Sequence, residues 1–406
     1  MEREHLEETG IWNKNFICVM AANFMLCMAH FSINPLVATY TMHLGATPQL
    51  AGLLTGMFFG ISFAFRPFVG PAMTKLDKRT LLILVFIIGA VANLGYALIH
   101  TIPAFVAFRF LSGIQFSFVG TLLMALAGDH LPYTRLTSGM GIYGISGAAA
   151  SAVAPAIGEG LRQLGTGLRG EAFGFTLMFL FGTVMLALAV IPSAILVPDK
   201  KSKSDLESTG AWWKNMFTIH AIPVTIVMFF IMVPHAMIHA YMFNFGVEQG
   251  VMGISVFYIV LAVTLGVSRP MGGYLIDRFG IATIMFPALA LFSVALFVIG
   301  SSHTLPMLLL GAVLAAIGFG SSQPSLQAMC IQTETPLRRG VATNTIYIAL
   351  DLGLFLGPII GAFISVRSDF AVMYRYAAIL PLLAIVCFAI ILPIHKRRLA
   401  TLDAAG

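Results

Sequence analysis

Long apolar segments alternate along this chain with shorter polar ones, and twelve apolar segments can be distinguished. An α-helix needs about 20 apolar residues to cross the hydrocarbon core of a bilayer. The pattern therefore predicts twelve transmembrane helices, near residues 15–40, 50–72, 80–100, 104–128, 137–158, 172–196, 218–244, 253–274, 282–301, 306–329, 341–366 and 372–394.

The main polar interruption lies half-way along the chain, at residues 198–214. It is charged and has no apolar period, which is typical of a solvated linker. We therefore expect an N-terminal six-helix bundle over 1–197, the linker over 198–214, and a C-terminal six-helix bundle over 215–406. The predicted fold class is an all-α polytopic membrane protein with twelve transmembrane helices.

The composition excludes several other classes of protein. Of the 406 residues, 58% are hydrophobic and only 10% are charged, whereas ordinary globular chains are about 25% charged. The net charge of +6 comes from basic residues scattered between the apolar segments, so we expect no nucleic-acid partner. The four cysteines lack paired spacing, which argues against a disulfide framework or a thiolate metal site.

Lysine and arginine are distributed unevenly over the segments that connect the predicted helices. One alternating set of segments, which includes the N-terminus, the linker and the C-terminal tail, holds 16 of the 23 basic residues, and the other set holds four. Because positively charged loops stay on the cytoplasmic side, we expect both termini and the linker to be cytoplasmic.

The chain contains an internal repeat at half its length. Arg66-Pro-Phe-Val-Gly70 recurs as Arg269-Pro-Met-Gly-Gly273, 203 residues later, and the same shift carries Pro155 onto Pro358 and Gly158 onto Gly361. These coincidences predict two copies of a six-helix unit, and parallel copies of this kind are one way to build alternating access.

The segment Gly273-Tyr-Leu-Ile-Asp277-Arg278-Phe-Gly280 resembles the cytoplasmic-loop signature of the major facilitator superfamily. The resemblance covers nearly the whole chain and implies two pseudo-symmetric six-helix bundles. In the first half, Gly70 is kept, but Thr74 stands where the family has an acid and Asp77 where it has the second Gly.

The loop signature suggests a cytoplasmic gate. A helix N-terminus exposes unpaired N–H groups and a partial positive charge, so Asp277 is placed to accept hydrogen bonds from a helix that starts near Thr137. Thr74 would do the same, without charge, toward a helix that starts near Gly340. The resemblance further implies that a basic residue of each loop bonds an acid, either Asp129 or Glu334. Ordinary loop charges that orient the chain remain the alternative.

Small residues and proline in the fifth span resemble the family's antiporter signature, and the eleventh span carries a stripe of small residues of its own. Stripes of small residues let helices approach closely, and we interpret them as sliding surfaces between the halves, with ordinary helix packing as the alternative. The positions concerned are Pro155 and Gly158 in the fifth span and Gly353, Gly357, Pro358 and Gly361 in the eleventh.

Arg109 lies inside the fourth predicted span, four residues before Gly113. A charge at such depth costs about 2.5 to 3.5 kcal/mol on the insertion scale, so it requires compensation. The run Arg109-Phe-Leu-Ser-Gly113 resembles the signature of drug:proton antiporters, although the first span carries His30 and Asn34 instead of the acid that many drug exporters have there.

Asp351 is the one carboxylate near the centre of a predicted span. The protonation of a buried carboxylate responds to its exposure to water and to neighbouring charges, so Asp351 is the candidate for proton coupling, with a structural ion pair or hydrogen bond as the alternative. Together with Arg109 it heads a set of polar residues expected to line a substrate cavity, namely His30, Asn34, His235, His239, Gln115, Gln323 and Gln327.

His235 and His239 share one helical face at a spacing that also suits a metal ion, but a polar cavity wall or plain packing is the better interpretation, and no metal or cofactor is expected. No P-loop run is present, which favours an ion gradient over ATP. A short Gly-x-Ser-Gly pattern at Ser146 is too weak to indicate a protease, so no enzymatic activity is expected.

These observations predict a monomeric secondary transporter of the bacterial cytoplasmic membrane. The expected function is proton-coupled efflux of small drug-like or amphiphilic compounds by alternating access. The alternative is transport of one small polar metabolite, such as a sugar, an organic acid or a metal-chelating zwitterion. The expected partners are the small-molecule substrate, protons and the lipid bilayer.

Overall fold

A computed structural model describes residues 10–198, 212–335 and 338–403. Within these ranges the regular structure is helical, and twelve helical segments are long and apolar enough to cross a membrane. This confirms the predicted fold class. Most of the linker expected over 198–214 lies outside the described residues.

The spans are built from the following helices. In the first half they are α2 (Lys14–Ile33) with α3 (Val37–His43), α4 (Pro48–Lys75), α5 (Lys78–Leu98), α6 (Ile102–Asp129), α7 (Leu136–Arg169) and α8 (Glu171–Ile195). In the second half they are α10 (Ile222–Glu248), α11 (Ser255–Phe279), α12 (Ile281–Gly300), α13 (Leu305–Gln332), α14 (Arg339–Arg367) and α15 (Phe370–Ala377) with α16 (Ile379–Asp403).

The first and last spans are interrupted, which the apolar pattern did not reveal. A 3-10 turn, η1 (Asn34–Leu36), separates α2 from α3. Pro35 explains this break, because proline has no backbone N–H and clashes with the preceding turn. Pro381 lies three residues beyond the break between α15 and α16, where it withholds the hydrogen bond that a continuous helix would require.

Helix α7 is longer than expected and continues to Arg169 instead of ending near residue 158. At 1.5 Å per residue its 34 residues span about 50 Å, more than the hydrocarbon core. The added turns are polar, and Glu159 pairs with Arg162 three residues on, 2.7 Å apart. The length of an apolar run indicates only the part of a helix that faces lipid. It therefore does not predict a polar extension such as the end of α7.

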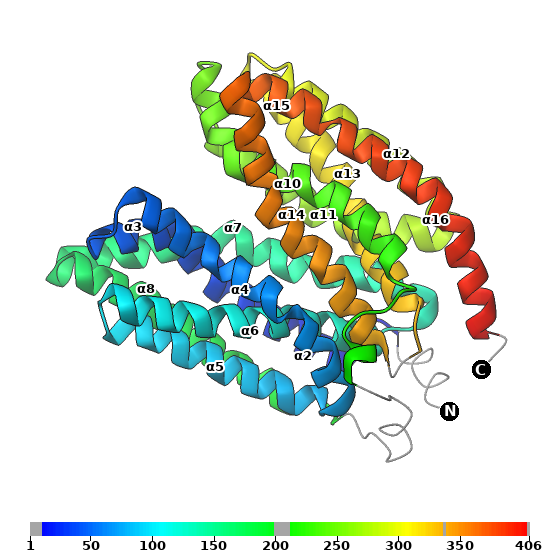
Figure 1. The fold of residues 1–406 in the computed structure, drawn as a ribbon, viewed down its shortest axis with the longest axis horizontal. Helices are drawn as coiled ribbons and strands as arrows, with labels where there is room; N and C mark the ends of the chain where they lie inside the picture. The colour runs from blue at the N-terminus through cyan, green and yellow to red at the C-terminus, as the bar shows by residue number, and fades with distance from the viewer. Residues whose placement is uncertain (1–9, 199–211, 336–337, 404–406) are drawn as a thin grey trace. The chain divides into compact units, whose positions relative to one another are not determined.

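The described chain divides into two compact units. Among the described residues, one consists of 12–130, 146–198 and 212–216, and the other of 10–11, 131–145, 217–335 and 338–403. Figure 1 shows the helices of both. The division differs from a simple split at the linker because the first ten residues of α7 pack with the C-terminal helices.

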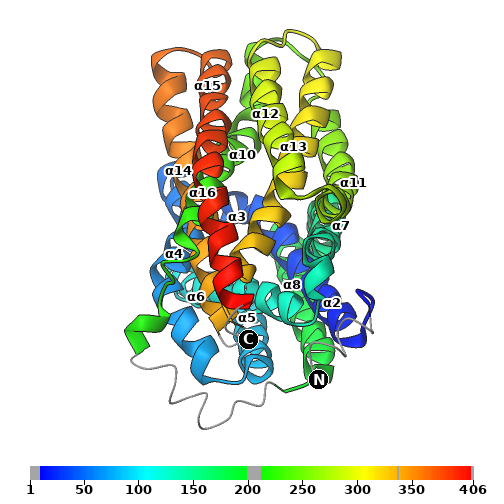
Figure 2. The ribbon, with the colours of Figure 1, turned by 90° about the vertical axis from the view of Figure 1, so that its right-hand side faces the viewer.

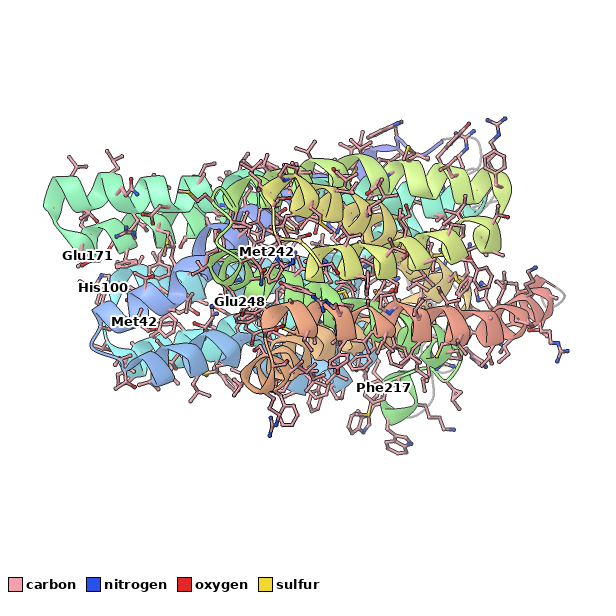
Figure 3. The ribbon with its side chains drawn as sticks, turned by 90° about the horizontal axis from the view of Figure 1, so that it is seen from above. Met42, His100, Glu171, Phe217, Met242 and Glu248 are labelled. Atoms are coloured by element: carbon pink, nitrogen blue, oxygen red, sulfur yellow. The ribbon has the colours of Figure 1, made fainter. Side chains whose placement is uncertain are left out.

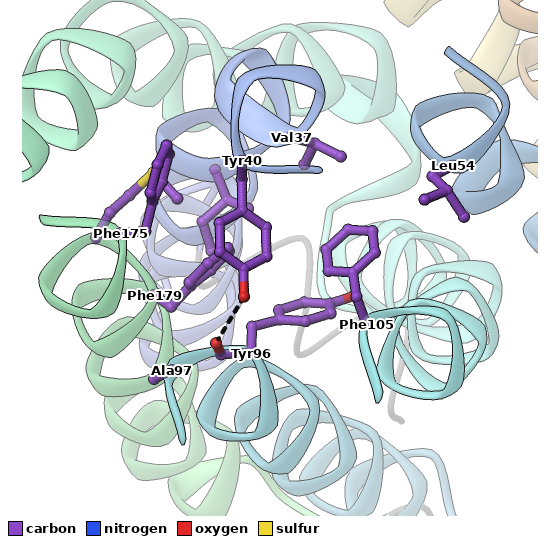
Figure 4. Packing of buried hydrophobic residues seen from close by; sticks show 10 residues of the cluster. Val37, Tyr40, Leu54, Tyr96, Ala97, Phe105, Phe175 and Phe179 are labelled. Carbon is purple, nitrogen blue, oxygen red and sulfur yellow. Dashed lines mark hydrogen bonds between the residues drawn. The ribbon is translucent and has the colours of Figure 1, made fainter. Parts of the chain in front are cut away.

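In the first unit, α5 packs against α6 and α8, α2 packs against α8, and α4 packs against α6. Its core contains a cluster of aromatic side chains around Tyr40, shown in Figure 4. The Tyr40 ring lies 4.8 Å from that of Phe179 and 5.0 Å from that of Phe175, and its hydroxyl lies 3.5 Å from the Tyr96 carbonyl oxygen. Edge-on aromatic packing of this kind adds to the stabilisation from burial.

The same end of this unit carries Met42, His100 and Glu171, as Figure 3 shows. His100 lies between the Tyr40 hydroxyl, 3.2 Å from its Nδ1, and the Thr176 hydroxyl, 3.2 Å from its Nε2. These bonds tie the ends of α3, α5 and α8 together.

In the second unit, α10 packs against α14 and α16, while α13 packs against α11 and α12. Figure 2 shows α16 running to the C-terminal end of the described chain. Figure 3 labels Glu248, the last residue of α10, and Phe217, which precedes the helix by five residues. Helix α10 starts at Ile222 rather than near residue 218, with Pro223 in its first turn, where proline is tolerated.

Candidate functional site

Arg109 on α6 is fully embedded in the first unit, with 2% of its surface exposed. Its guanidinium donates to the backbone oxygens of Leu54 (3.3 Å) and Thr55 (3.2 Å) and to Asn34 Oδ1 (3.2 Å), and it lies 4.6 Å from the centre of the Phe58 ring. Within the described residues no carboxylate pairs with Arg109. Neutral oxygens and an aromatic face therefore compensate this charge.

A small cavity adjoins Arg109. It has room for about one water, at about 10 Å³, and it draws its walls from α2, η1, α4, α5 and α6. The lining residues are His30, Ile33, Asn34, Phe58, Asn93, Tyr96, Arg109 and Ser112.

The predicted polar residues of the first unit gather only in part at this cavity. His30 and Asn34 line it, and the His30 ring lies 5.2 Å from that of Phe116. Gln115 is buried on α6 but does not line it. Gln115 packs close to α5. A Cβ placed on Gly89 of α5 would lie only 2.9 Å from the Cγ atom of Gln115.

Arg66 and Arg269, the repeated arginines, are also held by neutral groups. Arg66 donates to the Ser117 carbonyl oxygen at 2.7 Å and to Thr121 Oγ1 at 2.6 Å. Arg269 donates to the Gly144 carbonyl oxygen and to Gln323 Oε1, each at 2.8 Å. The sequence repeat thus marks two arginines that bind helices of their own unit, Arg66 one helix (α6) and Arg269 two (α7 and α13).

In the second unit, His235 stacks flat on Phe319 with ring centres 3.8 Å apart, and His239 lies 4.6 Å from His235. No group of three or more His, Cys, Asp or Glu side chains suited to a metal ion occurs among the described residues. Gln327 is buried on α13. The arrangement is that of two imidazoles in an aromatic wall.

Asp351 lies on α14 and is buried, with 1% of its surface exposed. Helix α14 packs against α10, α13 and α15. Asp351 and the His235–His239 pair therefore belong to one unit, whereas Arg109 and His30 belong to the other.

Asp277 lies in the last turn of α11 and bonds to the first turn of α7. Its Oδ2 accepts a hydrogen bond from the Ser138 N–H at 3.0 Å and another from the Ser138 hydroxyl. Gly273 permits this approach, because a Cβ there would lie 2.6 Å from the Thr137 carbonyl oxygen. All of these residues belong to the second unit.

The two remaining positions of the loop signature lie beside this contact. Gly280 joins α11 to α12 with φ at +85°, a conformation that residues with a side chain rarely adopt. The Arg278 side chain is exposed and donates to the Tyr274 hydroxyl at 3.3 Å.

The first-half copy of the signature is organised differently. The Thr74 hydroxyl is buried and donates to the Pro71 carbonyl oxygen of its own helix, at 2.9 Å. Gly70 lies against the backbone of Asn215, where an added Cβ would collide with the Asn215 carbonyl oxygen. Thr74 thus makes a local hydrogen bond.

The two acids have different kinds of partner. Asp129 accepts from Lys78 Nζ at 2.5 Å, as the family resemblance implied for a basic residue of the first loop. Glu334 does not bond Arg278 of the second loop, which corrects the expectation. Its carboxylate accepts from the Thr218 hydroxyl and from His220 Nδ1 (2.9 Å), and it lies 3.8 Å from the Arg398 guanidinium.

The contacts of the glycines in the eleventh span do not support their interpretation as a sliding surface between the halves. Gly353, Gly357 and Gly361 face α10 of the same unit, where an added Cβ would meet Met232, Ala236 and Tyr241 respectively. Similarly, Gly158 of α7 lies against Ser32 of α2 within the first unit. Close packing within each unit explains these small residues.

The prolines of these spans lie inside their helices, Pro155 in α7 and Pro358 in α14. The Pro358 carbonyl oxygen accepts a hydrogen bond from the Tyr241 hydroxyl at 2.5 Å, which adds a second link between α14 and α10.

Sequence reasoning did not assign Ser112, Tyr96 and Phe58 to the cavity beside Arg109. Tyr96 and Ser112 are held together by a hydrogen bond of 2.9 Å between their hydroxyls. Asn93, which also lines the cavity, is a polar residue inside an apolar span, and that signal was present in the sequence. A phenylalanine in an apolar helix carries no such signal.

The fold and these sites define a polytopic helical membrane protein with polar residues embedded in its spans. The chain matches the Major Facilitator Superfamily over residues 19–268 and 224–405, and it belongs to that family. It is therefore a transporter and not an enzyme.

Among similar proteins is an MFS-type transporter of Methanocaldococcus jannaschii, 23% identical over 91% of this chain and 96% of that protein. The multidrug resistance protein MdtG of Salmonella heidelberg is 24% identical over 90% of this chain and 92% of its own.

Solved structures with the same fold include the human organic anion transporter MFSD10, with a TM-score of 0.73 and 16% identity over 92% of this chain and 98% of that chain. They also include the proton:xylose symporter XylE, with a TM-score of 0.75 and 12% identity over 94% of this chain and 95% of that chain. At these identities the likeness concerns the fold alone.

Proposed function

We propose that this protein is a proton-coupled antiporter that exports small amphiphilic compounds across the bacterial cytoplasmic membrane, as a monomer with both termini in the cytoplasm. The observation that carries the proposal is Arg109, a buried cation with no carboxylate partner among the described residues, next to a polar cavity. The similarity to MdtG, which is named a multidrug resistance protein, supports efflux.

Arg109 favours substrates with an anionic or neutral polar group over lipophilic cations. A cation would enter a region that already holds a positive charge whose partners are all neutral, and the low dielectric constant of the protein interior strengthens such repulsion. An anionic group would instead supply the missing counter-charge. We therefore expect amphiphilic anions to be the better substrates.

Asp351 is the candidate for the coupling proton. It is a carboxylate buried in a span, and a buried carboxylate can take up and release a proton as access to water and neighbouring charge change. In the proposed cycle, proton binding at Asp351 and substrate binding near Arg109 favour opposite states of the transporter. Hydrogen bonding from Ser138 to Asp277 is proposed to hold the cytoplasmic side closed during part of that cycle.

The test is transport in proteoliposomes with an imposed pH gradient, with 1-anilinonaphthalene-8-sulfonate as an amphiphilic anion and rhodamine 6G as an amphiphilic cation. We expect gradient-driven flux of the anion, loss of flux in Asp351→Asn and Arg109→Ala, and its retention in Asp351→Glu, which keeps the exchangeable proton. Arg169→Ala, which removes an exposed arginine on α7, is the matched control. Unchanged flux in Asp351→Asn would show that the coupling assignment is wrong.

The polar lining of the cavity, including Asn34, Asn93 and Ser112, favours a second candidate function, the transport of one small polar metabolite. The same vesicles distinguish the two. Competition among chemically different amphiphiles indicates an exporter of broad range, whereas saturable movement of a single radiolabelled sugar or organic acid, unaffected by amphiphiles, indicates a specific carrier.

A further inference from the structure

A second cavity lies in the C-terminal unit, and none of the residues proposed to bind substrate or protons lines it. It has a volume of about 230 Å³ and lies between the start of α10, the end of α13 and the last turns of α16. The lining residues are Ile219, His220, Pro223, Val224, Thr333, Ile391, Ile394, His395 and Arg398.

The wall of this cavity is apolar except at one end. Ile394 and Ile219 are 53% and 72% exposed, so the apolar wall continues into the outer surface of the helices. Ile394 lies within a span of a membrane protein, so we expect the surface around it to face lipid tails. The cavity is therefore accessible from the bilayer, and hydrocarbon is its natural filling.

The polar end of the cavity is basic. Arg398 lines it and donates from Nε to the Thr333 carbonyl oxygen at 3.1 Å, which fixes the guanidinium at the rim. Lys396 and Arg397 are exposed on the same turn of α16. A charged turn at the end of an apolar span lies at the level of the lipid headgroups.

The acid nearest to this end faces inward. The Glu334 side chain is 2% exposed and is occupied by the Thr218 hydroxyl and by His220 Nδ1, in addition to Arg398 3.8 Å away. Glu334 offsets part of the charge of Arg398 from within the protein, but the Arg398 side chain is 27% exposed and its outer side stays open at the rim. The rim therefore remains suited to an anion.

His395 supplies an independent sign that a ligand belongs here. The residue is only 6% exposed, and its Nδ1 is buried with no hydrogen-bond partner among the described residues. A buried ring nitrogen without a partner costs free energy comparable to a lost hydrogen bond. Because His395 is one of the residues that line the cavity, a ligand oxygen bound there could supply the missing partner.

We propose that this cavity binds one anionic phospholipid, with its phosphate at Arg398 and His395 and the start of an acyl chain along Ile394, Ile391 and Val224. Basic pockets between transmembrane helices recognise anionic headgroups in this way. The apolar wall commits the site to a lipid rather than to a free anion, because phosphate alone would leave that wall unfilled.

The experiment is native mass spectrometry of the full chain in detergent, titrated with phosphatidylglycerol, with phosphatidylethanolamine of the same acyl chains, and with inorganic phosphate. We expect phosphatidylglycerol to bind at least about fivefold more tightly than phosphatidylethanolamine. Equal binding of the two lipids would overturn the proposal. Displacement of the lipid by inorganic phosphate at equal concentration would also overturn it, in favour of a free-anion site.

Variants locate the site. Arg398→Gln should weaken phosphatidylglycerol binding about fivefold, and Arg398→Lys, which keeps the charge, should restore it if the folded protein is intact. Arg397→Gln, which removes the same charge from the neighbouring exposed position, is the matched control and should bind as the parent does. Equal losses in Arg397→Gln and Arg398→Gln would mean unspecific attraction and would overturn the proposal.

The apolar wall is tested separately. Ile394→Gln places a polar amide in the path of the acyl chain and should weaken binding of phosphatidylglycerol, whereas Ile390→Gln changes an exposed residue one turn earlier that does not line the cavity. Loss of binding confined to Ile394→Gln supports the proposal. Equal effects of the two substitutions contradict it.

Discussion

Asp277 Oδ2 accepts a hydrogen bond from the backbone N–H of Ser138 over 3.0 Å, so a carboxylate at the end of α11 caps the beginning of α7. The Ser138 hydroxyl donates to the same oxygen. The first turn of a helix has unpaired N–H groups and a partial positive charge. An acid there is stabilised, and it fixes the position of the helix that it caps.

The first prediction concerns this pair. In reversible SDS unfolding of the purified protein, Asp277→Asn and Ser138→Ala should show a coupling free energy of about 1 to 2 kcal/mol in a double-mutant cycle. The reason is that Ser138→Ala removes the hydroxyl hydrogen bond to Asp277 Oδ2, and Asp277→Asn removes the charge that strengthens this bond. Asp277→Asn with Thr283→Ala, whose hydroxyl donates to the Phe279 carbonyl oxygen and not to Asp277, is the control pair and should be additive. Additivity in both pairs would show that the Asp277–Ser138 bond contributes no stability.

The second prediction concerns the glycine that allows this approach. Gly273→Ala should lower the unfolding free energy by about 1 to 3 kcal/mol, because its Cβ would lie 2.6 Å from a backbone oxygen of Thr137. Gly266→Ala, in the same helix, meets no atom within 4 Å and should be neutral or slightly stabilising, as expected from helix propensity. Thermal unfolding of both variants in detergent is the measurement, and equal melting temperatures would contradict the close packing.

The third prediction concerns the ion pair of Lys78 and Asp129, whose side chains are 5% and 19% exposed. Asp129→Asn should destabilise the protein by about 3 kcal/mol, since it removes the carboxylate charge that lies 2.5 Å from a buried ammonium. The double variant Lys78→Met with Asp129→Leu should recover most of that loss, because it removes both charges. SDS unfolding tests this, and a double variant no more stable than Asp129→Asn would show that the charge itself is not the cause.

The fourth prediction concerns the packing of α14 on α10. Gly357→Ala should destabilise the protein by about 1 to 3 kcal/mol, since its Cβ would lie 2.7 Å both from Ala236 Cβ and from the Val233 carbonyl oxygen. Gly56→Ala in α4 meets no atom within 4 Å and is the matched control. If Gly357→Ala melts at the same temperature as Gly56→Ala, α14 does not rest on α10 as described.

Several properties followed from the sequence because they depend on composition and on local pattern. Twelve spans follow from apolar length, since only a helix satisfies its own backbone hydrogen bonds in lipid. The family followed from the loop around Asp277 and from the repeat of Arg66 at Arg269. The isolated charge of Arg109 was visible as well, because an arginine inside an apolar segment stands out whatever its surroundings.

The tertiary structure decided which groups these residues meet. It placed the glycines at 353, 357 and 361 against α10, gave Glu334 the partners Thr218, His220 and Arg398, and surrounded Arg109 with neutral oxygens and Phe58. Helical periodicity specifies the face on which a side chain lies but not the helix opposite that face. Partners separated by a hundred residues or more therefore emerge only when the helices are packed.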